Sequence, residues 1–366
     1  MRSGRDHNIL FQPPLTTLSI GFGIFLVWLL TLLYLWFPAI KVTKRWPWIS
    51  QKGLKSSKIK LYPNLTNAVH VVLASDENTM GGMIAAMNSI YSNTKHNVMF
   101  HLVVDEDSVD HLVVWLTKSK LQLTNYEVKP FRKEWVKGKI KIHSGRKELS
   151  NPLNYARYYL PKLFPNLKKR VIYIDSDCIV QGDIHQLYSM KLKPGHIAAF
   201  SEDCTGVSKR LTLLKNNYAE YIDFKNKHVQ KLHLNPKACS FNTGLMVTEL
   251  GLWKKNNITS RLVYWMTLNT KEEVYGNEKG GGGSQPPMMI VFYQNYTHID
   301  PEWHTRHLGM TAGTSYSKQI VQHAKLLHWS GHFKPWNRLA QHSYIWDKYF
   351  LPDPTNKFKP VRRASV

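Results

Sequence analysis

The stretch Arg170-Val171-Ile172-Tyr173-Ile174-Asp175-Ser176-Asp177 decides the fold of this chain. Its first five residues are rich in β-branched and aromatic side chains and predict a buried β-strand. Two carboxylates follow at the strand end, so Asp175 and Asp177 can both approach one hard divalent cation, magnesium or manganese. Such an ion can bridge a diphosphate and stabilise the charge that develops on it as a leaving group. On these residues alone, a simple turn or helix cap stays an open alternative.

Short apolar strands alternate with helical patterns upstream of this stretch. Residues 70–74 and 98–104 are predicted strands, and helical patterns follow them at 81–90 and 109–121. This alternation predicts an α/β domain with a largely parallel sheet covered by helices on both faces. Ligands of such sheets bind beyond the carboxyl ends of the strands, so the loops there are the first places to search for a site.

A second motif, His328-Trp329-Ser330-Gly331-His332-Phe333-Lys334-Pro335-Trp336, lies far downstream. Together with residues 160–183 it resembles glycosyltransferase family 8, because H-x-x-G-x-x-K-P-W is a specific spacing at the right distance after D-x-D. The resemblance covers roughly residues 68–345 and is strongest to animal members of that family. It implies a GT-A type nucleotide-sugar transferase fold, with a mostly parallel Rossmann-like sheet flanked by helices.

The resemblance implies a manganese site, with magnesium as the alternative ion, formed by Asp175, Asp177 and His328. A neutral imidazole can complete an oxygen-rich coordination shell. Gly331 would let the backbone approach an anion closely, and Lys334 would supply a compact cation to the phosphates. Ser176 belongs to the expected UDP-sugar-binding set because it lies between the two acids. Trp336 is expected to pack rather than to bind a ligand.

The first loop after a strand is expected to bind the nucleoside. Ala74, Asp76 and Asn78 resemble the family segment that holds uracil and ribose, but Thr79 stands where an aromatic residue often follows. Base stacking would then be weaker or come from elsewhere. The same cluster also has the composition of a helix start, which stays open as an alternative.

Two further positions resemble the family's donor-sugar contacts. Arg157 resembles the family's basic residue near the donor diphosphate and sugar, and Phe241-Asn242-Thr243-Gly244 resembles the family segment that touches the donor sugar. Their alternatives are a solvent-facing helical arginine and an asparagine in a tight turn. Gln285 matches the family's catalytic glutamine, whereas Ser284 replaces the aspartate that usually precedes it. Gln285, Asn242 and Arg157 therefore form the expected catalytic set, with turnover placed in doubt by Ser284.

The N-terminal region contains an uncharged run of 23 residues, 15–37, long enough to cross about 30 Å of hydrocarbon as a helix. We expect a transmembrane signal-anchor there, because the run ends in aromatic residues rather than in the small residues of a cleaved signal peptide. The expected order is a cytoplasmic tail at 1–14, the anchor at 15–37, a stem at 38–67, the catalytic domain at 68–350 and a basic, solvated tail at 351–366. This arrangement predicts a single-pass type II protein of the Golgi membrane, or of the endoplasmic reticulum, with a lumenal catalytic domain.

The two orientation signals disagree. Five basic residues follow the run within 18 positions and two precede it, so the positive-inside rule points the other way. Three glycosylation sequons, at Asn64, Asn257 and Asn295, favour a lumenal C-terminal side.

Among the three cysteines, Cys178 is expected to be a buried thiol in an apolar strand. Cys204 and Cys239 are then the one pair that an oxidising lumen could bridge.

Composition restricts the partners. Lys and Arg outnumber Asp and Glu by 49 to 25, a net charge of +24, which predicts attraction to anions. The charge is scattered and follows no zinc-finger, RNP or basic-helix pattern, so we expect no nucleic-acid partner. A UDP-sugar donor, an acidic glycan acceptor and an anionic membrane surface fit the charge.

Three function classes compete. The leading one is a retaining glycosyltransferase that moves a hexose or pentose from a UDP-sugar to a glycan, glycoprotein or glycolipid. The second is a catalytically weak relative that binds UDP or a glycan as a scaffold, which Ser284 and Thr79 favour. The third is a nucleotidyltransferase, which also holds metal and diphosphate with paired acids; the downstream motif and the predicted anchor argue against it.

Overall fold

The computed structural model describes residues 58–61, 67–142, 147–204, 216–276, 283–310 and 316–362. All of them belong to the compact unit Ser57–Val366. The predicted anchor at 15–37, most of the predicted stem and the sequon at Asn64 lie outside these residues. Among the described residues, no helix is long and apolar enough to cross a membrane.

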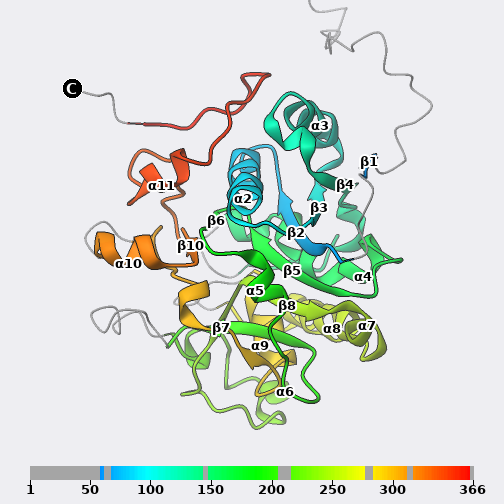
Figure 1. The fold of residues 1–366 in the computed structure, drawn as a ribbon. Helices are drawn as coiled ribbons and strands as arrows, with labels where there is room; N and C mark the ends of the chain where they lie inside the picture. The colour runs from blue at the N-terminus through cyan, green and yellow to red at the C-terminus, as the bar shows by residue number, and fades with distance from the viewer. Residues whose placement is uncertain are drawn as a thin grey trace, which may run out of the picture. The chain divides into compact units, whose positions relative to one another are not determined.

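The domain is built on an eight-stranded sheet in the order β1-β4-β3-β2-β5-β8-β7-β9 (Figure 1). Its central strands β4, β3, β2 and β5 are parallel, whereas β8 runs antiparallel to both β5 and β7. The strands are β1 Lys58–Lys60, β2 Val69–Ser75, β3 Val98–Val104, β4 Asn125–Pro130, β5 Arg170–Asp175, β7 Ala198–Glu202, β8 Phe241–Glu249 and β9 Thr297–His298. The predicted α/β class and the parallel core of the sheet are confirmed.

Alternation along the strands divides the core into two layers. Val71 and Leu73 of β2 pack on one face, with Ile172 and Ile174 of β5. The intervening residues of the same strands pack on the opposite face. Helices α2 (Met80–Asn93) and α3 (Val109–Thr117) cover the first face (Figure 1). Helices α7 (Leu250–Lys255), α8 (Ile258–Lys271) and α9 (Gln285–Val291) cover the second, and covering on both faces accounts for the near-continuous apolar strands.

The helices have these bounds: α2 Met80–Asn93, α3 Val109–Thr117, α4 Leu160–Leu163, α5 Ile184–Tyr188, α6 Lys227–Gln230, α7 Leu250–Lys255, α8 Ile258–Lys271, α9 Gln285–Val291, α10 Lys318–His323 and α11 Ser343–Asp347. Shorter 3₁₀ turns lie at Glu106–Ser108, Lys120–Leu123, Lys133–Trp135, Lys147–Ser150, Pro152–Tyr159, Tyr218–Glu220 and Pro301–Trp303. The predicted helix at 109–121 ends at Thr117, because Ser119 starts a separate 3₁₀ turn by accepting a hydrogen bond from the Leu121 amide.

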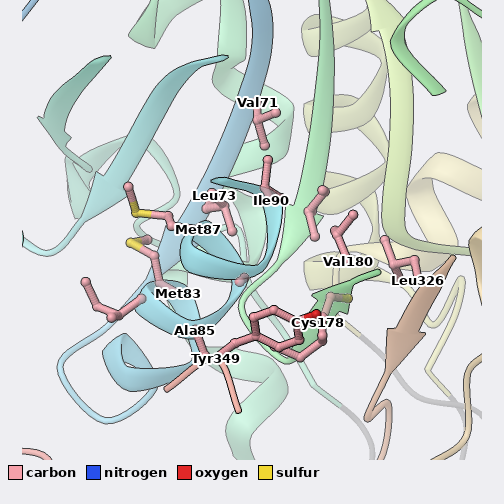
Figure 2. Packing of buried hydrophobic residues seen from close by; sticks show 14 of the residues in the cluster. Val71, Leu73, Met83, Ala85, Met87, Ile90, Cys178, Val180, Leu326 and Tyr349 are labelled. Atoms are coloured by element: carbon pink, nitrogen blue, oxygen red, sulfur yellow. The ribbon is translucent and has the colours of Figure 1, made fainter. Parts of the chain in front are cut away.

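A second, two-stranded sheet links the two sequence motifs. Strand β6, Cys178–Val180, pairs antiparallel with β10, Leu326–His328, so that His328 lies opposite Cys178. Cys178 and Val180 lie beside Leu326 and close to helix α2 in the core (Figure 2). Backbone pairing therefore carries His328 to the residue that follows Asp177.

The C-terminal segment differs from its prediction. Residues 351–362 pack on the domain at two points, because Phe358 is buried against Trp336 and Trp115 and Asp353 is buried as well, whereas Lys357 and Lys359 are exposed as predicted. The Asp353 carboxylate contacts His111 and accepts a hydrogen bond from the Phe358 amide. The folded domain thus extends at least to Phe358.

Candidate active site

One cavity, of about 670 Å³, lies where β2 and β5 end and β8 begins. It is lined by every residue that the sequence proposes for metal, donor or catalysis: Ala74, Asp76, Asn78, Arg157, Asp175, Ser176, Asp177, Asn242, Gln285, His328, Gly331 and Lys334. Their convergence is a geometric fact; the role of each remains a prediction. The cavity lies at the sheet edge where α/β folds bind ligands.

The second acid of the Asp-Ser-Asp motif is held by two partners from the downstream motif. The His328 Nε2 atom lies 3.1 Å from Asp177 Oδ1, and Lys334 Nζ lies 2.5 Å from Asp177 Oδ2. Asp177 is buried, which alone would raise its pKa, but the charges of Lys334 and His328 outweigh burial and lower that pKa. Asp177 is therefore an ionised carboxylate in a largely desolvated site.

Gly244 shows how closely three predicted site residues approach one another. A Cβ atom at position 244 would lie 2.4 Å from His328 Cε1, 2.7 Å from Asp175 Oδ2 and 3.0 Å from Asn242 Oδ1. A side chain does not fit at these distances without displacing its neighbours. Asp175, His328 and Asn242 thus meet around a point that glycine alone leaves open.

The donor atoms suit a hard divalent cation. Asp177, Cys178 and His328 each place one ligand atom within 4.8 Å of the others, and Asp175 meets His328 across Gly244. Burial raises the pKa of the Cys178 thiol well above its usual value, so Cys178 stays a neutral, buried thiol, as predicted. Two carboxylates and one imidazole remain, a set that fits manganese or magnesium better than a metal that needs thiolate.

Arg157 does not face solvent. Its Nη2 atom donates to Asp175 Oδ1 at 2.7 Å, its Nη1 donates to the Thr243 carbonyl, and the guanidinium lies 4.4 Å over the Tyr173 ring. The residue is only 4% exposed. The alternative of a solvent-facing arginine is therefore excluded, and Arg157 fixes the first acid of the motif against the start of β8.

The loop between β2 and α2 starts a helix, as one prediction had it, and also lines the cavity, as the other requires. Asp76 Oδ1 accepts a hydrogen bond from the Thr79 amide at 2.9 Å, which makes it part of the turn that starts α2. Its Oδ2 atom instead accepts from Asn151 Nδ2 at 2.7 Å, at the edge of the cavity. Asn78 is exposed and lines the cavity beside it.

The predicted sugar contacts, Asn242 and Gln285, also line the cavity. Asn242 Oδ1 accepts from the Gly244 amide at 2.8 Å, but both residues lie in strand β8, so the alternative of a tight turn is not what the structure has. Ser284 is 7% exposed and precedes α9, and its carbonyl accepts from the Tyr158 hydroxyl at 2.5 Å. Gln285 follows at the cavity wall and contacts the Tyr221 side chain.

Position 331 requires glycine for a reason other than the expected close approach of the backbone to an anion. Its φ of +121° favours glycine, and a Cβ atom there would lie 2.3 Å from the Gly309 carbonyl oxygen. The close approach is thus to the backbone of 309, although Gly331 also lines the cavity. Trp336 is buried against Trp346 and Phe358, as the packing interpretation predicted, while its edge reaches the cavity.

Sequence reasoning missed a buried polar group behind the cavity. Arg306 Nε lies 2.6 Å from Asp203 Oδ1, and the Ser240 hydroxyl donates to Asp203 Oδ2 at 2.6 Å. His304, two residues before Arg306, contacts His328. The one available signal was the run of polar residues at 304–307, which resembles an ordinary surface loop.

Cys204 and Cys239 form the predicted disulfide, with Cα atoms 5.7 Å apart. Cys204 directly follows Asp203, which lines the cavity. Asn257 and Asn295, the two sequons within the described residues, are both exposed. Their glycosylation stays a prediction.

Comparisons with known proteins agree with this geometry. The model of the family described as Glycosyl transferase family 8 matches residues 70–340. Glycosyltransferase 8 domain-containing protein 1 of Mus musculus is 46% identical over 299 residues, which cover 81% of this chain and 80% of that protein. Glycosyltransferase 8 domain-containing protein 2 of Macaca fascicularis is 43% identical over 299 residues, covering 81% and 85%.

Two solved structures share the fold at low sequence identity. The galactosyltransferase LgtC, in complex with donor and acceptor sugar analogs, superposes with a TM-score of 0.58 and 14% identity over 79% of this chain and 100% of its own. The bifunctional glycosyltransferase WbbM superposes with a TM-score of 0.56 and 20% identity, covering 80% and 51%. These likenesses show a GT-A-like α/β fold. By its family match and its relatives, the chain belongs to glycosyl transferase family 8.

Proposed function

We propose that this protein is a retaining, manganese-dependent glycosyltransferase that moves a sugar from a UDP-sugar to a glycan, glycoprotein or glycolipid acceptor. One observation carries the proposal. The pairing of β6 with β10 brings His328 and Lys334 to Asp177, at one end of a cavity that also contains Asp175. Two acids, an imidazole and a lysine are the groups that a metal-bound diphosphate needs.

Asp175, Asp177 and His328 would hold the manganese ion, which when bound supplies positive charge to the donor diphosphate. Lys334, whose side chain is 28% exposed, can turn from Asp177 to a phosphate oxygen. Arg157 remains on Asp175 and keeps that carboxylate in place. Asp76 and Asn78, in the loop between β2 and α2, would hold the ribose and base.

The sugar would lie between Asn242 and Gln285. Both side chains are amides, which orient hydroxyl groups but are weak nucleophiles. Asp203, the carboxylate beyond them, is occupied by Arg306 and Ser240. We therefore propose a front-face reaction: the bond from the anomeric carbon to the phosphate oxygen breaks, the acceptor oxygen bonds to the same face, and its proton passes to a phosphate oxygen of the departing UDP.

We also propose the predicted setting, a Golgi or endoplasmic reticulum membrane with the catalytic domain in the lumen. The Cys204–Cys239 disulfide supports an oxidising compartment. The predicted acidic acceptor has weaker support. The described cations that line the cavity are Arg157 and Lys334, and both contact the motif acids. A glycan acceptor is therefore proposed without a charge class.

The scaffold alternative rests on Ser284. Because no carboxylate stands at this family position, a protein that binds UDP without transferring a sugar has the same described geometry. Measuring both UDP binding and UDP release separates the scaffold from the transferase.

The test incubates the purified full-length protein with manganese and a panel of UDP-sugars and measures release of UDP. We expect release with at least one donor and its loss in Asp177→Asn. Asp110→Asn is the matched control, because Asp110 lies on α3 and its surface pair with Lys58 is half exposed. UDP binding without release from any donor, with and without an acceptor glycan mixture, would favour the scaffold. Release that survives in Asp177→Asn would refute the proposed site.

A further inference from the structure

A second imidazole lies directly behind His328. The His304 Nε2 atom is 2.8 Å from His328 Nδ1, and the two rings are nearly coplanar, with an angle of 7° between their planes. His304 is 2% exposed and His328 is 3% exposed. The opposite nitrogen of His328, Nε2, faces Asp177. His328 is therefore held between the Asp177 carboxylate on one side and the His304 imidazole on the other.

The segment that carries His304 is fixed to both neighbouring strands. The Thr305 amide donates to the Leu326 carbonyl at 2.9 Å, and the His328 amide donates to the Thr305 carbonyl at 2.8 Å. Arg306 is anchored on the Asp203 carboxylate just past the end of β7. His304 thus has a defined position relative to the His328 ring.

The chemistry of the pair restricts where its protons lie. His304 Nε2 and His328 Nδ1 lie 2.8 Å apart, so one of these two nitrogens donates a hydrogen bond and the other accepts it. A neutral imidazole has one donor nitrogen and one acceptor nitrogen. If His328 Nε2 is to offer its lone pair to a cation, the His328 proton must lie on Nδ1, and His304 Nε2 must accept it.

We propose that His304 is a positioning residue for the cation site, which fixes the ring plane of His328 and accepts the hydrogen bond from its Nδ1. The inference rests on the proposed metal site and adds a residue to it. His304 acts through His328 and touches neither cation nor donor.

This role predicts different manganese affinities for two variants of His304. In His304→Phe the ring volume is retained, but the His328 Nδ1–H is left in the core without an acceptor, so we expect manganese affinity to fall roughly tenfold to a hundredfold. In His304→Gln the amide oxygen can accept that hydrogen bond. His304 Nδ1 has no hydrogen-bond partner in the described part of the chain, and the amide nitrogen of a glutamine would replace that buried donor. Because glutamine keeps an acceptor for the His328 proton, His304→Gln should bind manganese about as tightly as the unmodified protein.

The experiment measures binding of manganese alone to the full chain by electron paramagnetic resonance, with thermal melting of each variant. His323→Phe is the control, because His323 is an exposed histidine on α10. The inference is supported if His304→Phe loses affinity while His304→Gln and His323→Phe retain it. It is overturned if His304→Phe binds like the unmodified protein, or if Gln and Phe lose affinity equally.

A second measurement does not depend on how well the variants fold. In the unmodified protein with magnesium, ¹⁵N spectra of labelled histidine should show His328 protonated at Nδ1 and hydrogen-bonded. A His328 ring protonated at Nε2 in saturating magnesium would overturn the inference. If the unmodified protein binds neither ion, the proposed metal site itself fails, which is a result distinct from a failure of His304 alone.

Discussion

Gly244→Ala tests whether Asp175, His328 and Asn242 must meet at one point. The added methyl group would lie 2.4 Å from His328 Cε1 and 2.7 Å from Asp175 Oδ2. Ordinary carbon contacts begin near 3.5 Å, so His328 has to move by about 1 Å or more. Gly244 lies in strand β8, where alanine is readily accommodated by the backbone, so the perturbation is one of space.

The expected effect on function is much larger than the effect on stability. Inserting one methyl group into a packed region costs about 1–3 kcal/mol of unfolding free energy, and about 2–4 °C in melting temperature for each kcal/mol. A displacement of about 1 Å at a site that needs defined geometry costs on the order of 100-fold in rate. We therefore expect a folded protein with strongly reduced UDP release and manganese affinity.

The assay compares Gly244→Ala with Gly251→Ala in manganese binding, UDP release and thermal melting. Gly251 is a suitable control because a Cβ atom there meets only the Lys168 carbonyl, at 3.2 Å, away from the cavity. Wild-type manganese affinity in Gly244→Ala would refute the close meeting of Asp175 and His328. Equal losses in the two variants would indicate a general packing defect instead.

Three other predictions follow from the contacts. Arg157→Lys keeps the charge but cannot reproduce the guanidinium contacts with Asp175 and the backbone, so UDP release should fall at least tenfold and melting temperature should drop, as kinetics and calorimetry would show. Replacing Cys204 and Cys239 by serine opens a loop with a separation of 35 residues and should cost about 2–4 kcal/mol in denaturant unfolding; an unchanged midpoint would contradict this. Burial alone would raise the pKa of Asp353, but hydrogen bonds from the Thr355 and Phe358 amides lower that pKa. The ionised carboxylate should therefore stabilise the fold above the ordinary carboxyl pKa, and this stabilisation should be lost as the pH falls through the lowered pKa of Asp353. Acid unfolding curves can test this, because Asp353→Asn should lack that pH dependence.

Much of the fold could be predicted because its core strands are short, apolar and β-branched. Strand Val98–Val104 has the predicted bounds, whereas β2 is one residue longer than predicted at both ends and β5 is one residue longer at its C-terminal end. The meeting of the Asp-Ser-Asp motif with His328 could be inferred from resemblance alone, since β6 and β10 are three residues each and have no distinctive pattern. Their pairing depends on tertiary contacts between distant segments.

The parts that escaped prediction are polar groups whose burial depends on the fold. His304 and Arg306 resemble a solvated loop in sequence, and only their contacts with His328 and Asp203 make them part of the core. The C-terminal segment was expected to be solvated because residues 357–363 contain four basic residues and only two large apolar ones, Phe358 and Val361. Phe358 nevertheless buries against Gly81, where a Cβ atom would lie 2.1 Å from the ring.

The most direct test of the central claim is equilibrium binding of manganese to the full chain in the presence of UDP. The proposed site predicts one bound ion per chain, with affinity lost in Asp177→Asn and retained in Asp110→Asn, because Asp177 contacts both His328 and Lys334 whereas Asp110 lies on the surface of α3. Manganese binding that is absent from the unmodified protein, or that persists undiminished in Asp177→Asn, would contradict it.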